Sequence, residues 1–262
     1  MSGRKIEPSP FFVGRVPYLN SAPFFAGLTI DGVEWADQPP RQCGLEAEAG
    51  RLLAAPLPLA DYLRLQDRVE RLGNLGIAVH GRCGSTSLFS RIPIRQLEGA
   101  TIAVTEESST TAMMLQLILE QRYRLTPAPI YQRGADAAAE ARLVIGDDAL
   151  RRHYADRRDP FEIDIAFEWW LWQHVPAVFA VWVVRKDAPA EEKQRLLRHL
   201  QRQLAGNLGR LDALAAERAE SLGAPKDELA AYLARFVYRF GDAEEQAINL
   251  FERLVREQQL II

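Results

Sequence analysis

The stretch that decides the fold is GRVPYLNSAPFF at positions 14–25, which follows the apolar residues 11–13. We interpret it as a strand that stops in a turn flanked by prolines and carrying Tyr18, Asn20 and Ser21. In open α/β sheets, ligands bind at the carboxyl ends of strands, so this turn is a candidate binding site. A purely structural turn is the alternative, because proline favours turns and asparagine tolerates their geometry.

Outward from this stretch, strand and helix patterns alternate through most of the chain. We expect strands at 11–16, 101–104, 143–145 and 178–184, the last of them in the centre of a sheet. Such alternation predicts an α/β fold with mixed, mostly parallel sheets that are flanked by helices.

The C-terminal region has helical patterns throughout. One helix is expected to begin near Asp187, with leucines on one face from 197 to 211. A second is expected at about 227–238. A third is expected from Asp242 to about 258, with an acidic capping box at its start. We interpret these helices as packing elements.

Composition limits the possible functions. The chain has 262 residues, 48% hydrophobic and 26% charged, which is enough for one large domain or two lobes. The net charge of −3 gives no electrostatic case for binding nucleic acid or an anionic membrane surface. Cys43 and Cys83 need not pair, which fits a reducing compartment. Because no apolar stretch has the length of a signal peptide or a membrane span, we expect a cytoplasmic protein without a membrane partner.

Four consecutive hydroxyl side chains precede an almost wholly apolar segment that we expect to be helical to about residue 123. They follow Glu106 and Glu107, and they are Ser108, Ser109, Thr110 and Thr111. Hydroxyl groups cap the free N–H groups of a helix start, and together with those groups they can hold a carboxylate or phosphate. The sequence leaves both roles open, but it contains no GxxxxGK[ST] nucleotide loop.

Two further segments carry candidate polar groups. In GRCGSTSLFS at 81–90, Ser85 lacks the histidine and acid partners of a nucleophile, so we interpret it as a hydrogen-bond donor, with a simple polar loop as the alternative. In LVIGDDAL at 143–150, Gly146 permits close backbone approach, and Asp147 or its neighbour could cap a helix. The histidines and cysteines lack metal-ligand spacing, so we predict no metal.

Together these segments resemble the chorismate dehydratase family of the menaquinone pathway that runs through futalosine. The resemblance covers residues 12 to about 184 in the same order. The matched positions are Gly14, Arg15, Tyr18, Leu19, Asn20, Gly81, Ser85, Leu88, Ser90, Ser109, Thr110, Thr111, Leu143, Ile145, Gly146, Asp147, Ala149, Leu150, Asp164, Glu168, Trp169, Pro176 and 178–182.

The resemblance implies a two-lobed fold similar to type 2 periplasmic binding proteins, with a ligand cleft between the lobes. One lobe would comprise residues 1–93 and 186–262, and the other residues 94–185. It implies dehydration of chorismate to 3-[(1-carboxyvinyl)oxy]benzoate, and we predict no cofactor. Asn20 and Ser85 are expected at the reacting centre. The expected substrate-binding residues are Tyr18, Ser108, Ser109, Thr110, Thr111, Gly146 and Asp147. The sequence does not indicate an oligomeric state.

Some residues depart from the family pattern. Leu53 and Pro56 interrupt a segment in which the family has G-x-L-D-x-G, and Arg82 stands where the family often has a small or apolar residue. These departures keep two alternatives open: a cytoplasmic binding or sensor protein for a small carboxylate, or a divergent member with another substrate. The fold alone does not separate an enzyme from a binding protein.

Overall fold

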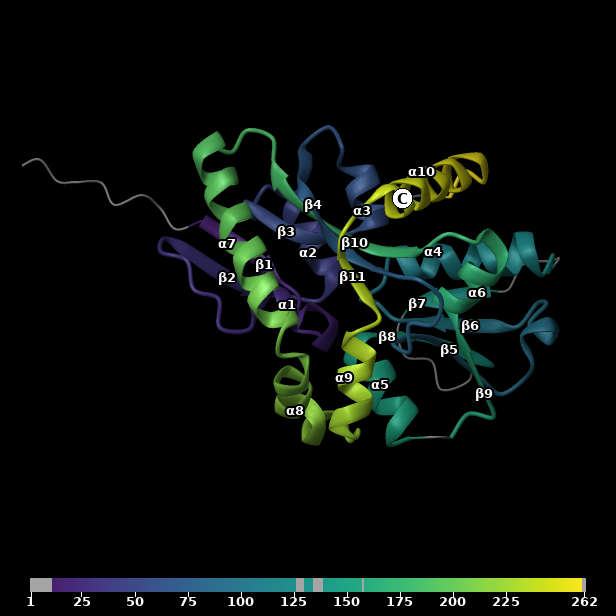
Figure 1. Cartoon of the computed structure of the whole chain (residues 1–262). Coiled ribbons are helices and arrows are strands. Elements are labelled where there is room, and N and C mark those ends of the chain that lie inside the picture. The colour runs from purple at the N-terminus through teal and green to yellow at the C-terminus, as the bar shows by residue number, and fades with distance from the viewer. Residues whose placement is uncertain (1–10, 126–129, 134–138, 157, 261–262) are drawn as a thin grey trace, which may run out of the picture.

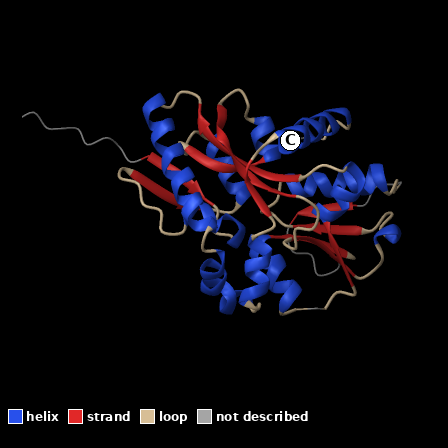
Figure 2. Cartoon of the chain, in the orientation of Figure 1, coloured by secondary structure: helices blue, strands red, loops and turns tan. Residues whose placement is uncertain are grey.

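The computed structural model describes residues 11–125, 130–133, 139–156 and 158–260. These residues form two β-sheets with helices packed around them (Figures 1 and 2). Across the six-stranded sheet the order is β11 (Phe236–Arg239), β4 (Val69–Val79), β10 (Ala177–Arg185), β3 (Ala54–Pro58), β1 (Phe11–Arg15) and β2 (Val33–Asp37). Across the five-stranded sheet it is β7 (Ile130–Arg133), β6 (Thr101–Val104), β8 (Ala141–Ile145), β5 (Thr86–Ser90) and β9 (Phe161–Asp164).

Both sheets are mixed. β1 lies parallel to β2 and β3, and β6 lies parallel to β7 and β8. The pairs that β10 makes with β3 and β4, β11 with β4, and β5 with β8 and β9 are antiparallel. Among the described strands, antiparallel pairing is thus about as common as parallel pairing, which differs from our expectation of mostly parallel sheets. β10 occupies the predicted central position, and its antiparallel insertion between β3 and β4 accounts for part of the difference.

The chain passes between the sheets at other places than the boundaries expected near residues 93 and 185. β5 pairs with β8 and β9, so the first crossing lies in the segment 80–85. β10 pairs with β3 and β4, so the return lies at about 174–176. An apolar run shows that a segment is a buried strand, but it does not show which sheet the strand joins, because its partners are distant in sequence.

The helices form three groups around the sheets (Figure 1). α7 (Ala190–Leu208) lies along α1 (Ala22–Phe25) and contacts β4. α8 (Leu211–Leu222) packs against α9 (Lys226–Leu233) and α5 (Gly146–Tyr154). α10 (Asp242–Glu257) contacts β10, α3 (Leu59–Arg64) and α4 (Thr110–Leu117). The remaining elements are α2 (Pro40–Glu48), α6 (Ile165–Gln173), the π-helical turn η3 (Ile118–Arg122), and the 3₁₀ turns η1 (Leu19–Ser21) and η2 (Ile94–Gln96).

The C-terminal helices agree only in part with the expectation. The helix expected near Asp187 is α7, which begins at Ala190, and its buried leucines include Leu200 and Leu204. The helix expected at 227–238 ends at Leu233, and Tyr238 lies in β11, because the aromatic and β-branched run FVYR favours a strand. α10 begins at Asp242 as predicted, but Glu244 supplies the carboxylate that accepts the Gly241 N–H, 2.9 Å away.

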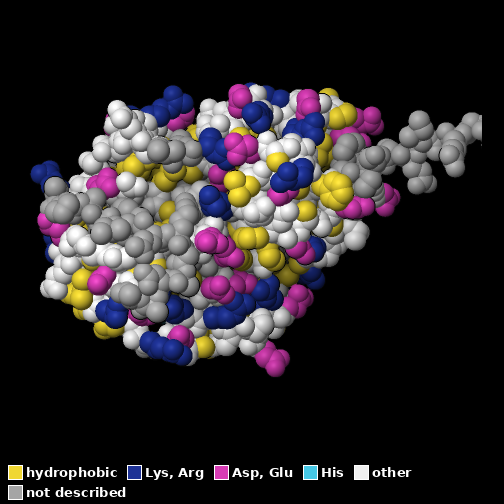
Figure 3. Space-filling model, turned by 180° about the vertical axis from the view of Figure 1, so that it is seen from behind, with side chains coloured by type: hydrophobic (Ala, Val, Ile, Leu, Met, Phe, Trp, Pro, Cys, Tyr) yellow, Lys and Arg dark blue, Asp and Glu magenta, His cyan; other side chains and the backbone are white. Residues whose placement is uncertain are grey.

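The core beside the six-stranded sheet is strongly aromatic. Phe24 makes edge-on ring contacts with Trp182 and Tyr238, at centroid distances of 5.6 and 5.5 Å. On the face shown in Figure 3, acidic and basic side chains are interspersed, as their alternation in the sequence suggests. Within the described ranges, no helix has both the length and the apolar character needed to cross a membrane.

Candidate active site

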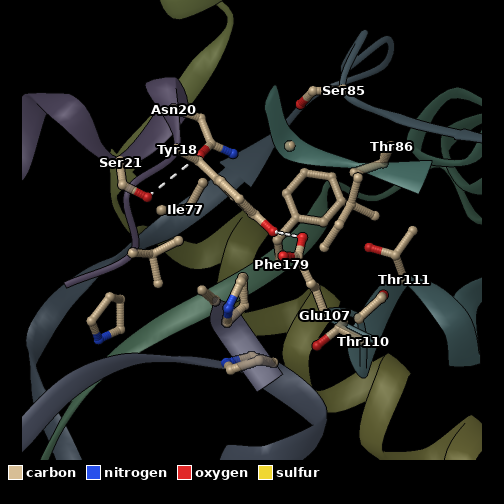
Figure 4. Close-up of a pocket in the computed structure, with 18 of the residues that line it drawn as sticks. Tyr18, Asn20, Ser21, Ile77, Ser85, Thr86, Glu107, Thr110, Thr111 and Phe179 are labelled. Carbon is tan, nitrogen blue, oxygen red and sulfur yellow. Dashed lines mark hydrogen bonds between the residues drawn. The ribbon is translucent and has the colours of Figure 1, made fainter. Parts of the chain in front are cut away.

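A pocket lies between the two sheets and receives residues from both (Figure 4). The space between protein atoms there is about 550 Å³, a figure that includes open solvent at the mouth of the pocket. The six-stranded sheet and its turns contribute Val16, Tyr18, Asn20, Ser21, Pro40, Pro56, Pro58, Ile77, Phe179 and Ala180. The five-stranded sheet and its turns contribute Ser85, Thr86, Glu107, Ser108, Ser109, Thr110, Thr111, Ile145 and Gly146.

The opening turn places Tyr18 across this pocket. β1 ends at Arg15, and the Ser21 N–H donates to the Tyr18 carbonyl at 3.0 Å, which closes the turn before η1. The Tyr18 side chain extends into the cavity, where its hydroxyl donates to the Glu107 carboxylate from the other side (Figure 4). Burial and this carboxylate raise the pKa of the Tyr18 phenol, so it remains a protonated hydrogen-bond donor.

Glu107 was not among the predicted site residues. The sequence showed only that Glu106 and Glu107 are adjacent, and adjacency does not indicate which carboxylate faces a ligand. The structure selects Glu107, which lines the pocket and meets a tyrosine 89 positions away.

Gly146 lies directly behind the Tyr18 ring. Its φ is +63°, a left-handed backbone conformation that favours glycine. A Cβ at this position would lie 2.6 Å from Cδ2 and Cε2 of Tyr18. The Gly146 N–H also donates to the Ser85 carbonyl at 2.8 Å. The close backbone approach predicted at this glycine therefore occurs, and it brings the opening turn, the glycine–serine segment and the start of α5 together.

The two residues expected at the reacting centre, Asn20 and Ser85, both line the pocket. The Asn20 side-chain oxygen lies 3.4 Å from the Ser21 hydroxyl, which donates to it. Ser85 is fully buried, and its hydroxyl oxygen accepts a hydrogen bond from the Tyr232 hydroxyl at 2.8 Å. Its oxygen also lies 3.3 Å from Cys83 Sγ. Burial raises the pKa of that thiol to about 12, which keeps Cys83 protonated.

The four hydroxyl residues at the start of α4 have different partners. Ser108 accepts the Ala112 N–H at 3.2 Å, a helix-capping contact. Ser109 donates to the buried Asp61 carboxylate at 2.7 Å. Thr110 accepts the Ala60 N–H at 3.1 Å.

Ser109 and Thr110 therefore join α4 to α3, and Ser108 has the capping role that the sequence left open. The Thr111 hydroxyl points into the pocket (Figure 4). All four residues line the cavity, but three of the hydroxyl groups already have protein partners.

Asp147 is the one predicted site residue that does not line the pocket. One of its carboxylate oxygens accepts the Leu19 N–H at 2.8 Å, and the other accepts from the Arg218 guanidinium on α8. Arg218 also donates to the Pro17 carbonyl at 3.4 Å. Burial raises the pKa of Asp147, although these contacts oppose the shift. Asp147 thus holds the opening turn against α5 and α8.

The electrostatics of the pocket are unusual for a site that would take an anion. Among the described residues that line it there is no arginine, lysine or histidine, whereas Glu107 contributes a carboxylate. An anionic ligand would therefore depend on neutral donors and on the start of α4, where the helix dipole favours negative charge. No three His, Cys, Asp or Glu side chains converge as a metal site would require, within the residues that the structure describes.

Comparison with known proteins supports the family resemblance seen in the sequence. A family model described as menaquinone biosynthesis matches residues 12–257. A curated protein of Thermus thermophilus, named chorismate dehydratase, is 28% identical over 261 residues, with 92% of this chain and 94% of the relative covered.

Solved structures with low sequence identity show the fold. Protein AF1704 from Archaeoglobus fulgidus has a TM-score of 0.79 at 17% identity, covering 97% of this chain and 100% of its own. The alkanesulfonate-binding protein SsuA from Xanthomonas axonopodis pv. citri, bound to MOPS, has a TM-score of 0.72 at 14% identity, covering 98% and 95%. The predicted fold, similar to periplasmic binding proteins, is therefore confirmed, and the family model identifies the chain as a member of the menaquinone biosynthesis family.

Proposed function

We propose that this chain is a cytoplasmic hydro-lyase that converts chorismate to 3-[(1-carboxyvinyl)oxy]benzoate and water. The observation that carries the proposal is the convergence of Asn20, Ser85, Tyr18 and Gly146 on one pocket between the sheets. Family membership and the relative named chorismate dehydratase support the same reaction.

The reaction removes the C3 proton and the C4 hydroxyl group of chorismate. The C3 position is conjugated through the ring alkene to the ring carboxylate, so negative charge spreads onto that carboxylate as the proton leaves. Preorganised donors lower the barrier most where charge develops. The start of α4, with the Thr111 hydroxyl directed into the pocket, is the element that we assign to this carboxylate.

Asn20 and Ser85 are assigned to the other end of the reaction. Both carry neutral groups that can donate a hydrogen bond, and both line the cavity. We assign them to orienting the ring and to hydrogen bonding with the C4 hydroxyl group as it departs.

The proton needs an acceptor. None of the described residues that line the pocket is a histidine, and the carboxylate among them, Glu107, already accepts the Tyr18 hydroxyl. We infer that the side-chain carboxylate of the substrate removes the C3 proton. The bond between C4 and its oxygen then breaks, the ring becomes aromatic, and the proton leaves with the hydroxyl group as water. Atoms and charge balance without a cofactor.

Two features favour a second candidate, a family member that binds or converts another small carboxylate. Pro56, one of the departures from the family pattern, lines the pocket. Glu107 places a carboxylate inside a cavity that would have to receive a dianion. The other departures do not line the pocket. The Leu53 N–H donates to the Phe12 carbonyl at 2.8 Å, and Cζ of the Arg82 guanidinium lies 4.6 Å from the centroid of the Phe167 ring.

The test compares Asn20→Ala and Ser85→Ala with Ser87→Ala. Ser87 is a matched control on β5, because its hydroxyl donates to Glu162 at 3.0 Å and the residue does not line the pocket. Turnover of chorismate and thermal unfolding are measured for each. We expect the first two variants to lose at least about 100-fold in turnover and to stay folded, as loss of a group that acts in the transition state predicts. Wild-type turnover in both would refute the assignment.

A further inference from the structure

The Ser85 hydroxyl is held by a residue from the distant C-terminal part of the chain. Tyr232, on α9, is buried with 2% of its surface exposed, and its hydroxyl donates to Ser85 Oγ at 2.8 Å. Burial keeps the pKa of this phenol well above its usual value, so the Tyr232 proton stays in place as a donor.

This contact determines what the Ser85 hydroxyl can do. A hydroxyl group has one proton to donate and two lone pairs with which to accept. Because Tyr232 donates its proton to Ser85 Oγ, the Ser85 proton is directed elsewhere, toward a ligand oxygen or toward Cys83 Sγ at 3.3 Å. Thiol sulfur is a weak acceptor, so a ligand oxygen is the stronger partner for that proton. Accepting one hydrogen bond also polarises a hydroxyl group for donating the next.

We propose that Tyr232 is a positioning residue, which fixes and polarises the Ser85 hydroxyl so that it donates to the ligand in the pocket. The effect on turnover rests on the proposed function, whereas the orientation of Ser85 does not.

The surroundings of the tyrosine keep its ring and the segment above it in place. Its ring makes an edge-on contact with Phe236 of β11 at a centroid distance of 5.0 Å. A Cβ on Gly84 would lie 3.9 Å from Cδ2 of Tyr232, so the backbone just before Ser85 lies close to that ring.

The backbone around Ser85 also has supports that do not involve the tyrosine hydroxyl. The Gly84 N–H donates to Asp164 at 2.7 Å, and the Ser85 carbonyl accepts the Gly146 N–H at 2.8 Å. Tyr232→Phe therefore removes one hydroxyl group and leaves the segment that carries Ser85 supported.

Tyr238 offers a matched control. It lies on β11 in the same aromatic cluster, with a centroid distance of 6.1 Å between its ring and that of Phe236, and it is 3% exposed. Its buried hydroxyl has no hydrogen-bond partner among the described residues. Tyr238→Phe thus deletes an equivalent buried hydroxyl group that does not reach Ser85.

The first arm of the test measures kcat and KM for chorismate in the wild type, Tyr232→Phe, Tyr238→Phe, Ser85→Ala and the double variant of Tyr232 and Ser85. We expect Tyr232→Phe to lower kcat roughly tenfold with little change in KM, the scale of one lost hydrogen bond. Tyr238→Phe should stay within about twofold of the wild type. In the Ser85→Ala background, Tyr232→Phe should have no further effect. Wild-type kcat in a folded Tyr232→Phe variant, or additive losses in the double variant, would overturn the proposal.

The second arm needs no turnover. Crystal structures of the two phenylalanine variants would show the Ser85 side chain directly. We expect Ser85 Oγ to leave its wild-type rotamer or to occupy more than one in Tyr232→Phe, and to remain single in Tyr238→Phe. An unchanged Ser85 rotamer in Tyr232→Phe would overturn the proposal even if the wild type did not convert chorismate, which by itself would refute only the proposed reaction.

Discussion

Replacing Gly146 by alanine tests how closely the opening turn fits against the start of α5. Gly146 has a φ of +63°, and a Cβ there would lie 2.6 Å from two carbon atoms of the Tyr18 ring. The new methyl group therefore has to displace the ring that crosses the pocket, and with it the hydrogen bond from Tyr18 to Glu107.

The expected loss of stability has three parts. A left-handed conformation costs an alanine about 1–2 kcal/mol. Forcing a methyl group against a packed side chain costs about 1–3 kcal/mol. The reduced freedom of the unfolded chain restores about 0.4–1 kcal/mol. The free energy of unfolding should therefore fall by roughly 1–5 kcal/mol.

Gly99→Ala separates the backbone part from the contact with the ring. Gly99 has a φ of +68°, and a Cβ there would meet no atom within 4 Å. This variant has only the backbone cost, so its loss should be at most about 1.6 kcal/mol. The difference between the two variants measures the contact of the methyl group with the Tyr18 ring.

Urea unfolding gives both stabilities by linear extrapolation, and chorismate turnover is measured beside it. We expect Gly146→Ala to be the less stable variant and to lose turnover, and Gly99→Ala to keep wild-type turnover. Equal losses of stability in the two variants, with turnover intact in both, would refute the packing of Tyr18 against Gly146.

Three further substitutions have definite expected outcomes. Glu107→Gln removes a negative charge from the pocket but still accepts from Tyr18. Two like unit charges 4 Å apart in water repel each other by about 1 kcal/mol, so removing the Glu107 charge should lower KM for chorismate about fivefold. A large fall in kcat instead would indicate that Glu107 takes part in proton transfer. Burial raises the pKa of Asp61 above 3.8, so the stability that this group contributes is present below that pH and is lost as pH rises through the raised pKa. As the pH rises from acid to neutral, the free energy of unfolding of Asp61→Asn, measured in urea, should therefore increase relative to that of the wild type. A difference in unfolding free energy between the two proteins that stays constant with pH would contradict this. Asp147→Asn keeps one acceptor oxygen where the carboxylate has two, so the N–H of Leu19 or of Arg218 loses its partner, and the free energy of unfolding should fall by about 1–3 kcal/mol. Unchanged stability would show that the opening turn does not depend on this carboxylate.

The sequence was most informative where a residue type is needed for a local reason. Gly146 was predicted to allow close backbone approach, and it does so against Tyr18. The turn after the first strand was predicted to present Asn20 and Tyr18, and both line the pocket. These features depend on backbone geometry and on the place where a strand ends, which a short segment of sequence can reveal.

Contacts between distant segments could not be predicted in this way. Asp147 was expected to touch the substrate, but it bonds to Leu19 and Arg218, which are 128 and 71 positions away. Tyr232 was placed in a helix, as it is, but nothing local indicates that its hydroxyl reaches Ser85 across 147 positions. Which polar group faces a ligand and which faces another part of the protein is decided by tertiary packing.

The proposed dehydration is tested most directly by incubating the purified wild-type protein with chorismate and separating the products by chromatography with mass detection. We expect a new aromatic species, lighter than chorismate by one water, that accumulates as chorismate is consumed. Unchanged chorismate in the presence of folded protein would contradict the proposed reaction.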